Sequence, residues 1–167
     1  MTALVTLAEV QQFKQVSNSI NTAKFNELVL QVQQVELYPL LGEDLYWAVI
    51  NDASSYADLL DGGTYDYQGK TYQNVGLKAV ISHYWYAYHS FYGDQVDTAF
   101  GLREKLNNDV SKQVDTSMKK TLFEHNSKYA FNLWLNVERF LERTNEPLYK
   151  CGTKIKNTHF IISKIGK

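Results

Sequence analysis

The sequence predicts a mainly α-helical protein: a bundle of four to six helices with one long C-terminal helix, a small β-hairpin insert and an extended C-terminal arm. Apolar residues recur at helical spacing through most of the chain. A tyrosine-rich stretch, 64–74, instead alternates around a Gln-Gly-Lys turn. The segment 151–167 is lysine-rich and strand-like. We therefore expect one helical domain, 1–150, followed by a basic arm, 151–167.

The N-terminal elements follow from capping signals. Thr6 and Glu9 form a capping box for a short helix that we expect to run to about Val16. Asn21 or Thr22 caps a second helix, through about Leu37. Its apolar positions are Phe25, Leu28, Val29, Val32 and Val35. Pro39 disfavours helix at the residue before it, so we expect an end near Tyr38, with a kink as the alternative.

Two short helices and the hairpin come next. A helical run covers Asp44 to Ile50, and Ser54 or Ser55 opens another that Gly62–Gly63 closes. The hairpin at 64–74 must lean on another element, because an isolated hairpin is marginal in water. Its aromatic residues are Tyr65, Tyr67 and Tyr72.

The stretch 76–93 is the most aromatic part of the chain. Its helical spacing predicts that a first set of residues faces the core and that a second faces outward. The first set is Leu77, Ile81, Tyr84, Tyr88 and Phe91; the second is Tyr86 and Tyr92. The segment 94–109 is mixed, because Gly101 interrupts its helical pattern.

The longest helix is expected at about 114–143, and Asn145–Pro147 stops it. Its apolar stripe is predicted to comprise Met118, Leu122, Tyr129, Leu133, Trp134, Val137, Phe140 and Leu141.

Charge and cysteine content narrow the function classes. The net charge is −1, which argues against nucleic-acid binding by bulk electrostatics. Cys151 is the only cysteine, so no intramolecular disulfide forms. The chain starts without the pattern of a signal peptide and has no long apolar run, so we expect synthesis in a reducing compartment and no membrane partner. Aromatic residues make up 14% of the chain, and twelve are tyrosines, which suits interfaces.

Catalytic and metal-binding patterns are weak. His83 and His89 lie about 240° apart on one helix, too far round to share a metal ion. We predict no catalytic residue, metal or cofactor. Glu43/Asp44 and Asp94/Asp97 lie at apparent helix starts, where acids favour the helix dipole. An enzyme alternative would pair His83 with Asp94 or Asp97 in a pocket.

The arm is the stronger interface candidate. Phe160, Ile161 and Ile162 are too apolar for a typical disordered end. With Lys154 and Lys156 they form a strand-prone segment that can pair with a sheet edge of its own hairpin or of a neighbouring subunit. A frayed, solvated tail is the alternative. We place Tyr65, Tyr67 and Tyr72 in the same interface hypothesis.

Several motifs in order resemble a family of small tailed-phage proteins that connect head to tail, as in phages of Bacteroidetes hosts, including the crAss-like group. The motifs are "LYPLLGEDLYWAVI", "YADLLDGGTYDYQGKTYQNVGLKAVISHYWYAYHSFY", "DTAFGLREKLNNDVS" and "ERFLERTNEPLYKCG". They cover roughly three quarters of the chain and carry no catalytic signature.

The resemblance implies a helical adaptor that forms a ring, usually twelve-fold, between the portal and the tail around the DNA channel. Its partners would be copies of itself, the portal protein and further neck or tail proteins, with at most passive contact with genomic DNA. The protein would be made in the host bacterial cytoplasm and end in the virion neck. A non-viral helical interaction module is the alternative.

Overall fold

The computed structural model describes residues 1–93, 95–98, 101–104 and 115–150, with side chains for 1–93 and 115–150. The helical elements are α1 (Leu7–Phe13), α2 (Thr22–Val32), the π-helical turn η1 (Gln33–Leu37), α3 (Tyr38–Leu41), α4 (Glu43–Asn51), the 3-10 turn η2 (Ala53–Tyr56), α5 (Ala57–Asp61), α6 (Leu77–Tyr92) and α7 (Thr116–Thr144). The strands are β1 (Gly63–Tyr67), β2 (Lys70–Asn74), β3 (Gln95–Thr98) and β4 (Gly101–Glu104).

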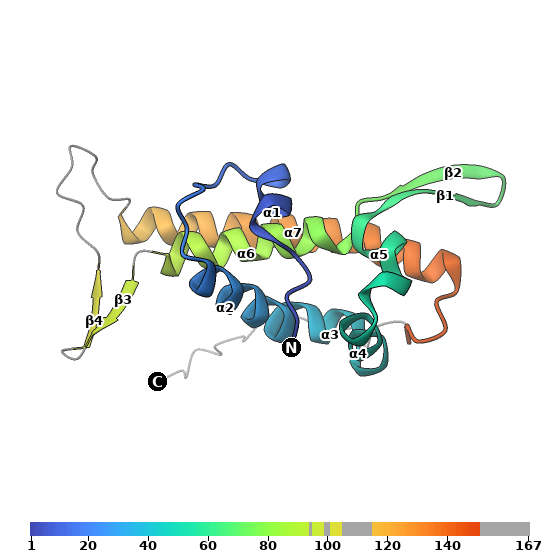
Figure 1. The fold of residues 1–167 in the computed structure, drawn as a ribbon. Helices are drawn as coiled ribbons and strands as arrows, with labels where there is room; N and C mark the ends of the chain where they lie inside the picture. Colours follow the sequence, from blue (N-terminus) through green and yellow to red (C-terminus); the bar gives the residue numbers. More distant parts are fainter. Residues whose placement is uncertain (94, 99–100, 105–114, 151–167) are drawn as a thin grey trace, which may run out of the picture.

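The antiparallel pair α6 and α7 forms the long axis of the molecule (Figure 1). The helix α1 lies on one side of this pair, and α2 lies on the other. Strands β1 and β2 pair antiparallel and project from one end of the body; β3 and β4 pair antiparallel at the opposite end. The predicted mainly helical fold, long last helix and hairpin insert are confirmed. The second strand pair, β3 with β4, was not predicted, and Asp97 lies in β3 rather than at the expected helix start.

The central helix α6 is buried on nearly all sides, because α1, α2, α5 and α7 surround it. Of its five predicted core residues, all but the half-buried Phe91 are buried. Trp85 is fully buried, and its indole N–H donates to the Phe25 carbonyl at 3.3 Å. Tyr92 is exposed as predicted. Tyr86 is half-buried instead: it packs against the core, and the Lys14 ammonium lies 5.1 Å from its ring centre.

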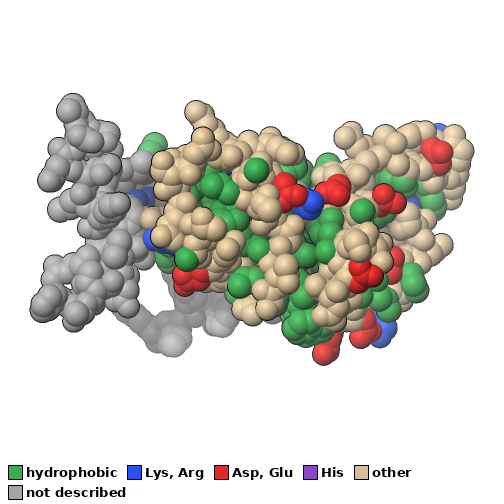
Figure 2. Space-filling model, in the orientation of Figure 1, with side chains coloured by type: hydrophobic (Ala, Val, Ile, Leu, Met, Phe, Trp, Pro, Cys, Tyr) green, Lys and Arg blue, Asp and Glu red, His purple; other side chains and the backbone are tan. Residues whose placement is uncertain are grey.

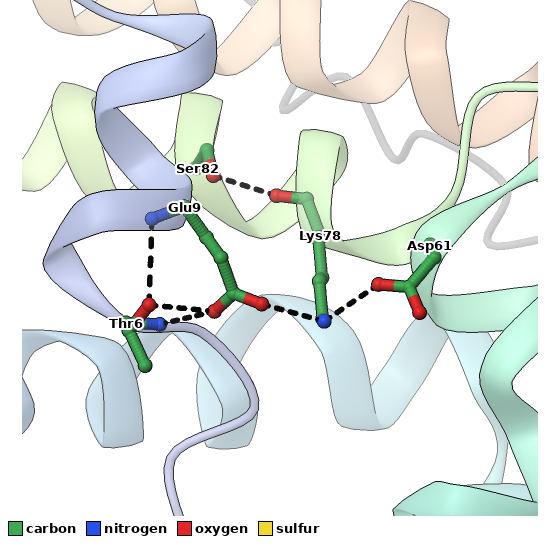
Figure 3. Close-up of polar contacts among 5 residues, drawn as sticks. All are labelled: Thr6, Glu9, Asp61, Lys78 and Ser82. Atoms are coloured by element: carbon green, nitrogen blue, oxygen red, sulfur yellow. Dashed lines mark hydrogen bonds and ion pairs between the residues drawn. The ribbon is translucent and has the colours of Figure 1, made fainter.

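A lysine joins the first helix to the middle of the chain (Figure 3). The capping box forms as predicted: the Thr6 hydroxyl accepts from the Glu9 amide, and the Glu9 carboxylate accepts from the Thr6 amide at 2.7 Å. The Lys78 ammonium, from the first turn of α6, lies 2.6 Å from both Glu9 and Asp61. It therefore ties α1 and α5 to the start of α6. The helix α1 ends at Phe13, earlier than predicted.

The expected end of the second helix near Tyr38 is wrong. Helical structure continues to Leu41 and stops at Gly42, where φ is +77°. The wide turn η1 accommodates Pro39: just before it, the Tyr38 N–H donates to the Gln33 carbonyl, five residues back. Such a turn contains one extra residue and shifts the later positions around the helix. As a result Val35, predicted to be apolar and inward, is 53% exposed.

The N-terminal segment is held at the same turn. Gln33 is fully buried, and its side-chain oxygen accepts from the Leu4 N–H at 2.8 Å. Its side-chain nitrogen donates to the Thr2 carbonyl at 3.1 Å. The Gln33 side chain thereby pairs with one backbone donor and one backbone acceptor of the N-terminal segment.

The next helix start also differs from the prediction. Asp52, rather than Ser54 or Ser55, is the cap, because its carboxylate accepts from the Ser55 N–H. Gly62 closes α5 as predicted, with φ at +77°.

Two glycines meet at the base of the first hairpin. A Cβ on Gly62 would lie 2.8 Å from the backbone nitrogen of Gly76, and one on Gly76 would lie 2.7 Å from that of Gly62. The buried Asn74 side chain donates to the Asp58 carbonyl at 2.8 Å, and Asn136 of α7 accepts from the Val75 N–H at 2.9 Å. The hairpin is therefore fixed at its root by backbone contact and by two asparagines.

The predicted stripe of α7 is correct only in its second half. Trp134, Val137 and Leu141 are buried, whereas Met118 is 57% exposed and Tyr129 is 47% exposed. The buried positions of the first half are Lys119, Asn126 and Ala130. Asn126 accepts from the Lys14 ammonium at 2.7 Å and donates to the Leu122 carbonyl. A polar contact with the end of α1 thus takes the place of an apolar one.

Candidate interaction surface

Large apolar side chains are exposed on and beside α3 and α4, and we call this area the α3–α4 surface. Its members and their exposed fractions are Met1 (50%), Val35 (53%), Tyr38 (37%) and Trp47 (46%). The buried Tyr46 links three of them: its ring centre lies 5.1 Å from that of Tyr38 and 5.3 Å from that of Trp47, and its hydroxyl contacts the Met1 sulfur at 3.4 Å. Figure 2 shows hydrophobic atoms gathered at the lower edge of the molecule, over α3 and α4. Exposed aromatic residues and methionine are typical of protein interfaces.

The α3–α4 surface lies in an acidic part of the chain. Residues 33–51 contain Glu36, Glu43 and Asp44 and no Lys or Arg. Asp44 lies in the first turn of α4, one turn before Trp47, and its carboxylate is 2.5 Å from the Lys150 ammonium. Lys150 is the last residue that the structure describes, so the chain leaves the described body beside this surface.

The hairpin tyrosines lie on one face, against the end of α7. Tyr65 and Tyr72 are cross-strand partners with ring centres 5.8 Å apart, and the Tyr65 ring is 5.0 Å from that of Phe140. The Arg143 guanidinium lies 3.9 Å from the Tyr72 ring centre and 5.3 Å from that of Tyr67. The predicted interface tyrosines are therefore half-buried within their own subunit, and the hairpin leans on α7.

The opposite face of this hairpin is open. Thr64, Asp66, Thr71 and Gln73 alternate with the tyrosines and are exposed. The Thr71 hydroxyl donates to the Asp66 carboxylate across the strands at 2.6 Å. This polar face and the outer strand edges are available for contacts with another chain.

The remaining predicted interface residues lie outside the described residues: Lys154, Lys156, Phe160, Ile161 and Ile162. The same holds for Cys151 and for the side chains of Asp94 and Asp97. The pairing of His83 with either acid, on which the enzyme alternative depends, stays a prediction.

His83 is a buried histidine whose pKa is shifted strongly by its surroundings. It is 8% exposed, its ring centre lies 4.5 Å from that of Tyr129, and its Nδ1 has no hydrogen-bond partner among the described residues. Burial and the nearby Lys14 ammonium lower the pKa of its imidazole to about 4. A neutral histidine packed against a tyrosine in this way is accounted for by the core alone.

The described ranges contain neither a metal-binding cluster nor a membrane-spanning helix. Among residues 1–93 and 115–150, no three His, Cys, Asp or Glu side chains are placed to hold a metal ion. None of the helices described is both long and apolar enough to cross a bilayer.

Sequence reasoning missed the α3–α4 surface. Helical spacing places Val35 on the buried face of the second helix, and Tyr38 enters the sequence prediction only as the residue before Pro39. The available signal was the run "LYPLLGEDLYW", in which aromatic residues flank a proline and a glycine without any basic residue.

The comparisons with known proteins identify a family, but that family has no assigned activity. Neither the search of curated proteins nor that of solved structures returned a match. One family model matches residues 37–159, which include α4, α6, α7 and the first hairpin. This match covers more than half of the chain, and the protein therefore belongs to the Family of unknown function (DUF6712).

Proposed function

We propose that this protein is a structural virion component, a head–tail connector that forms a ring between the portal and the tail. The observation that carries the proposal is the position of the two hairpins, β1–β2 and β3–β4, at opposite ends of an elongated helical body (Figure 1). A closed ring needs a heterologous interface, in which two different surfaces of each subunit meet. A two-stranded sheet at either end provides strand edges for such contacts.

Two further features support assembly. The α3–α4 surface exposes Tyr38 and Trp47, residue types that are enriched at interfaces. The resemblance of the segment 25–150 to phage connectors gives the specific role, with copies of this chain, the portal and other neck proteins as partners. In the assembled ring the apolar part of the arm would contact a neighbouring subunit. Genomic DNA would pass through the ring, and the near-neutral charge of the chain is compatible with a channel that does not hold phosphates.

The test uses particles of the phage that encodes the chain, because free connector subunits can stay monomeric until they meet the portal. We expect mass spectrometry to detect the protein in purified virions and cryo-electron microscopy to place it as a ring in the neck. The same measurement on heads that lack tails shows whether the protein joins the particle before the tail does. Purified virions that lack the protein would contradict the proposal.

The α3–α4 surface also fits the alternative, a helical interaction module outside virions. In that case an affinity-tagged chain would recover a host or phage protein that is not part of the particle, and Trp47→Ser would abolish the recovery.

A further inference from the structure

We propose that in the free subunit the α3–α4 surface is covered by residues 159–163 of the same chain. This inference concerns the isolated subunit and does not depend on the connector role. It follows from three observations: an apolar surface with no described partner, the place where the chain leaves the body, and the charges on both sides.

The α3–α4 surface exposes several large apolar side chains that a short apolar segment can cover. Val35, Tyr38 and Trp47 are each more than one third exposed, and Met1 borders them through Tyr46. Exposed apolar patches rimmed by polar residues mark interaction sites. The segment 159–163, His-Phe-Ile-Ile-Ser, offers three consecutive large apolar side chains, Phe160, Ile161 and Ile162.

The covalent geometry favours the chain's own segment. The ammonium of Lys150, the last described residue, lies beside Asp44 in the first turn of α4, and Trp47 lies one turn further along that helix. Phe160 lies ten positions after Lys150, and a chain of that length spans at most about 35 Å when fully extended. The segment therefore reaches the surface easily, and the short tether gives it a local concentration in the millimolar range or above.

The charges are complementary. Residues 33–51 carry Glu36, Glu43 and Asp44 and no base, whereas 151–167 carry Lys154, Lys156, Lys164 and Lys167 and no acid. Lysines lie on both sides of the apolar segment, so docking brings opposite charges together at the rim of the contact. This arrangement favours the correct approach and orientation more than it adds affinity.

Trp47 is a built-in reporter of the cover. It is 46% exposed in the described body, whereas Trp85 and Trp134 are at most 3% exposed. Acrylamide quenching of tryptophan fluorescence in the full chain, at a concentration where light scattering gives a monomer, therefore measures access to this surface. We expect weak quenching in the natural chain and a severalfold larger quenching constant for Ile161→Asp/Ile162→Asp.

Matched variants test whether the rise in quenching comes from the loss of the apolar side chains and is reported by Trp47. Asn157→Asp/Thr158→Asp adds the same charge but keeps the apolar residues, and we expect at most a small rise in quenching. Trp47→Phe in the Ile161→Asp/Ile162→Asp background should remove the rise. Circular dichroism of each full-length variant confirms that the helical body is folded.

Disulfide trapping separates the chain's own segment from that of another copy. With Cys151→Ser, Trp47→Cys and Ile162→Cys should oxidise to a monomeric species on a non-reducing gel. Equal quenching in the natural chain and the Ile161→Asp/Ile162→Asp variant would overturn the proposal. Protection that disappears on dilution, or a disulfide-linked dimer in place of the monomer, would also overturn it, by assigning the surface to a second copy.

Discussion

The Leu4 backbone N–H donates a 2.8 Å hydrogen bond to the side-chain oxygen of Gln33, a residue at the start of a π-helical turn. The same side chain donates to the Thr2 carbonyl. The N-terminal segment is thus attached to the place where the second helix adjusts to Pro39.

Replacing Gln33 by leucine should lower the free energy of unfolding by about 1–3 kcal/mol, because the buried Leu4 N–H and the Thr2 carbonyl lose their partner. Urea denaturation followed by circular dichroism measures the change. Gln34→Leu, at the exposed neighbouring position, is the control and should have little effect. Equal effects of the two substitutions would show that the hydrogen bonds to Gln33 do not matter.

Removing the Lys78 ammonium should loosen α1 and α5 together. Burial alone would raise the pKa of Glu9, but the hydrogen bonds from Lys78 and Thr6 outweigh it and lower that pKa. Glu9 therefore contributes stability above its ordinary pKa of 4.5, and the contribution is lost as the pH falls through the lowered value. Lys78→Met should cost about 1 kcal/mol at neutral pH, since the groups are partly exposed.

The control for Lys78 is Lys120→Met, which removes an exposed lysine 3.9 Å from Glu124 and should change stability far less. Added salt should lower the free energy of unfolding of the natural chain more than that of the Lys78→Met variant. A cost that is the same for both lysines would contradict the special role of Lys78.

His83 should make the protein sensitive to mild acid. Its pKa falls from 6.5 to about 4 on folding, so the unfolded chain binds the proton more readily. Stability from neutral His83 is complete above pH 6.5 and decreases by up to about 3 kcal/mol as the pH falls to 4. In His83→Phe, which keeps a ring beside Tyr129, the decrease between pH 6.5 and 4 should be smaller. Parallel pH curves for the two proteins would contradict this pKa shift.

Arg143 should hold the first hairpin on α7. Its guanidinium stacks on the Tyr72 ring and donates to the Tyr65 hydroxyl at 3.1 Å. Arg143→Lys keeps the charge but loses the planar contact, at a cost of about 1 kcal/mol to hairpin docking. Hydrogen exchange of the amides in 63–74 should then be faster. Arg139→Lys, at an exposed position of the same helix, should leave exchange unchanged.

The arm should matter for assembly and little for folding. Deletion of Lys154–Lys167 should leave the helical circular dichroism signal nearly unchanged while reducing ring formation or docking on the portal. Ile161→Asp/Ile162→Asp should act in the same direction. Electron microscopy of assembly reactions is the measurement, and normal rings from the deleted chain would contradict the prediction.

The helices and the first hairpin could be predicted because their signals are local. The capping box at Thr6, the cap at Asn21 and the Gln68–Gly69 turn act within a few residues, and each forms. The side of the helix that is buried was harder to predict. Met118 and Tyr129 are exposed, and the buried Asn126 of α7 instead accepts from Lys14 at the end of α1, a pairing between residues far apart in the sequence.

A similar reason explains why the α3–α4 surface could not be predicted. Helical periodicity places Val35 inward only if every turn contains the same number of residues, and the extra residue in η1 changes that. Pro39 predicts a disturbance of the regular helix, but the sequence does not say whether the helix ends, bends or widens there.

Gly62 and Gly76 lie backbone to backbone at the base of the first hairpin, so no side chain fits at either position. Any larger residue at either position would force the two strands apart where they leave the body and would redirect the whole projection. At the Gln68–Gly69 tip there is open space, although the φ of +73° at Gly69 favours glycine at that one position. Engineered tags and loop insertions therefore belong at the tip, where they extend the projection without changing its direction.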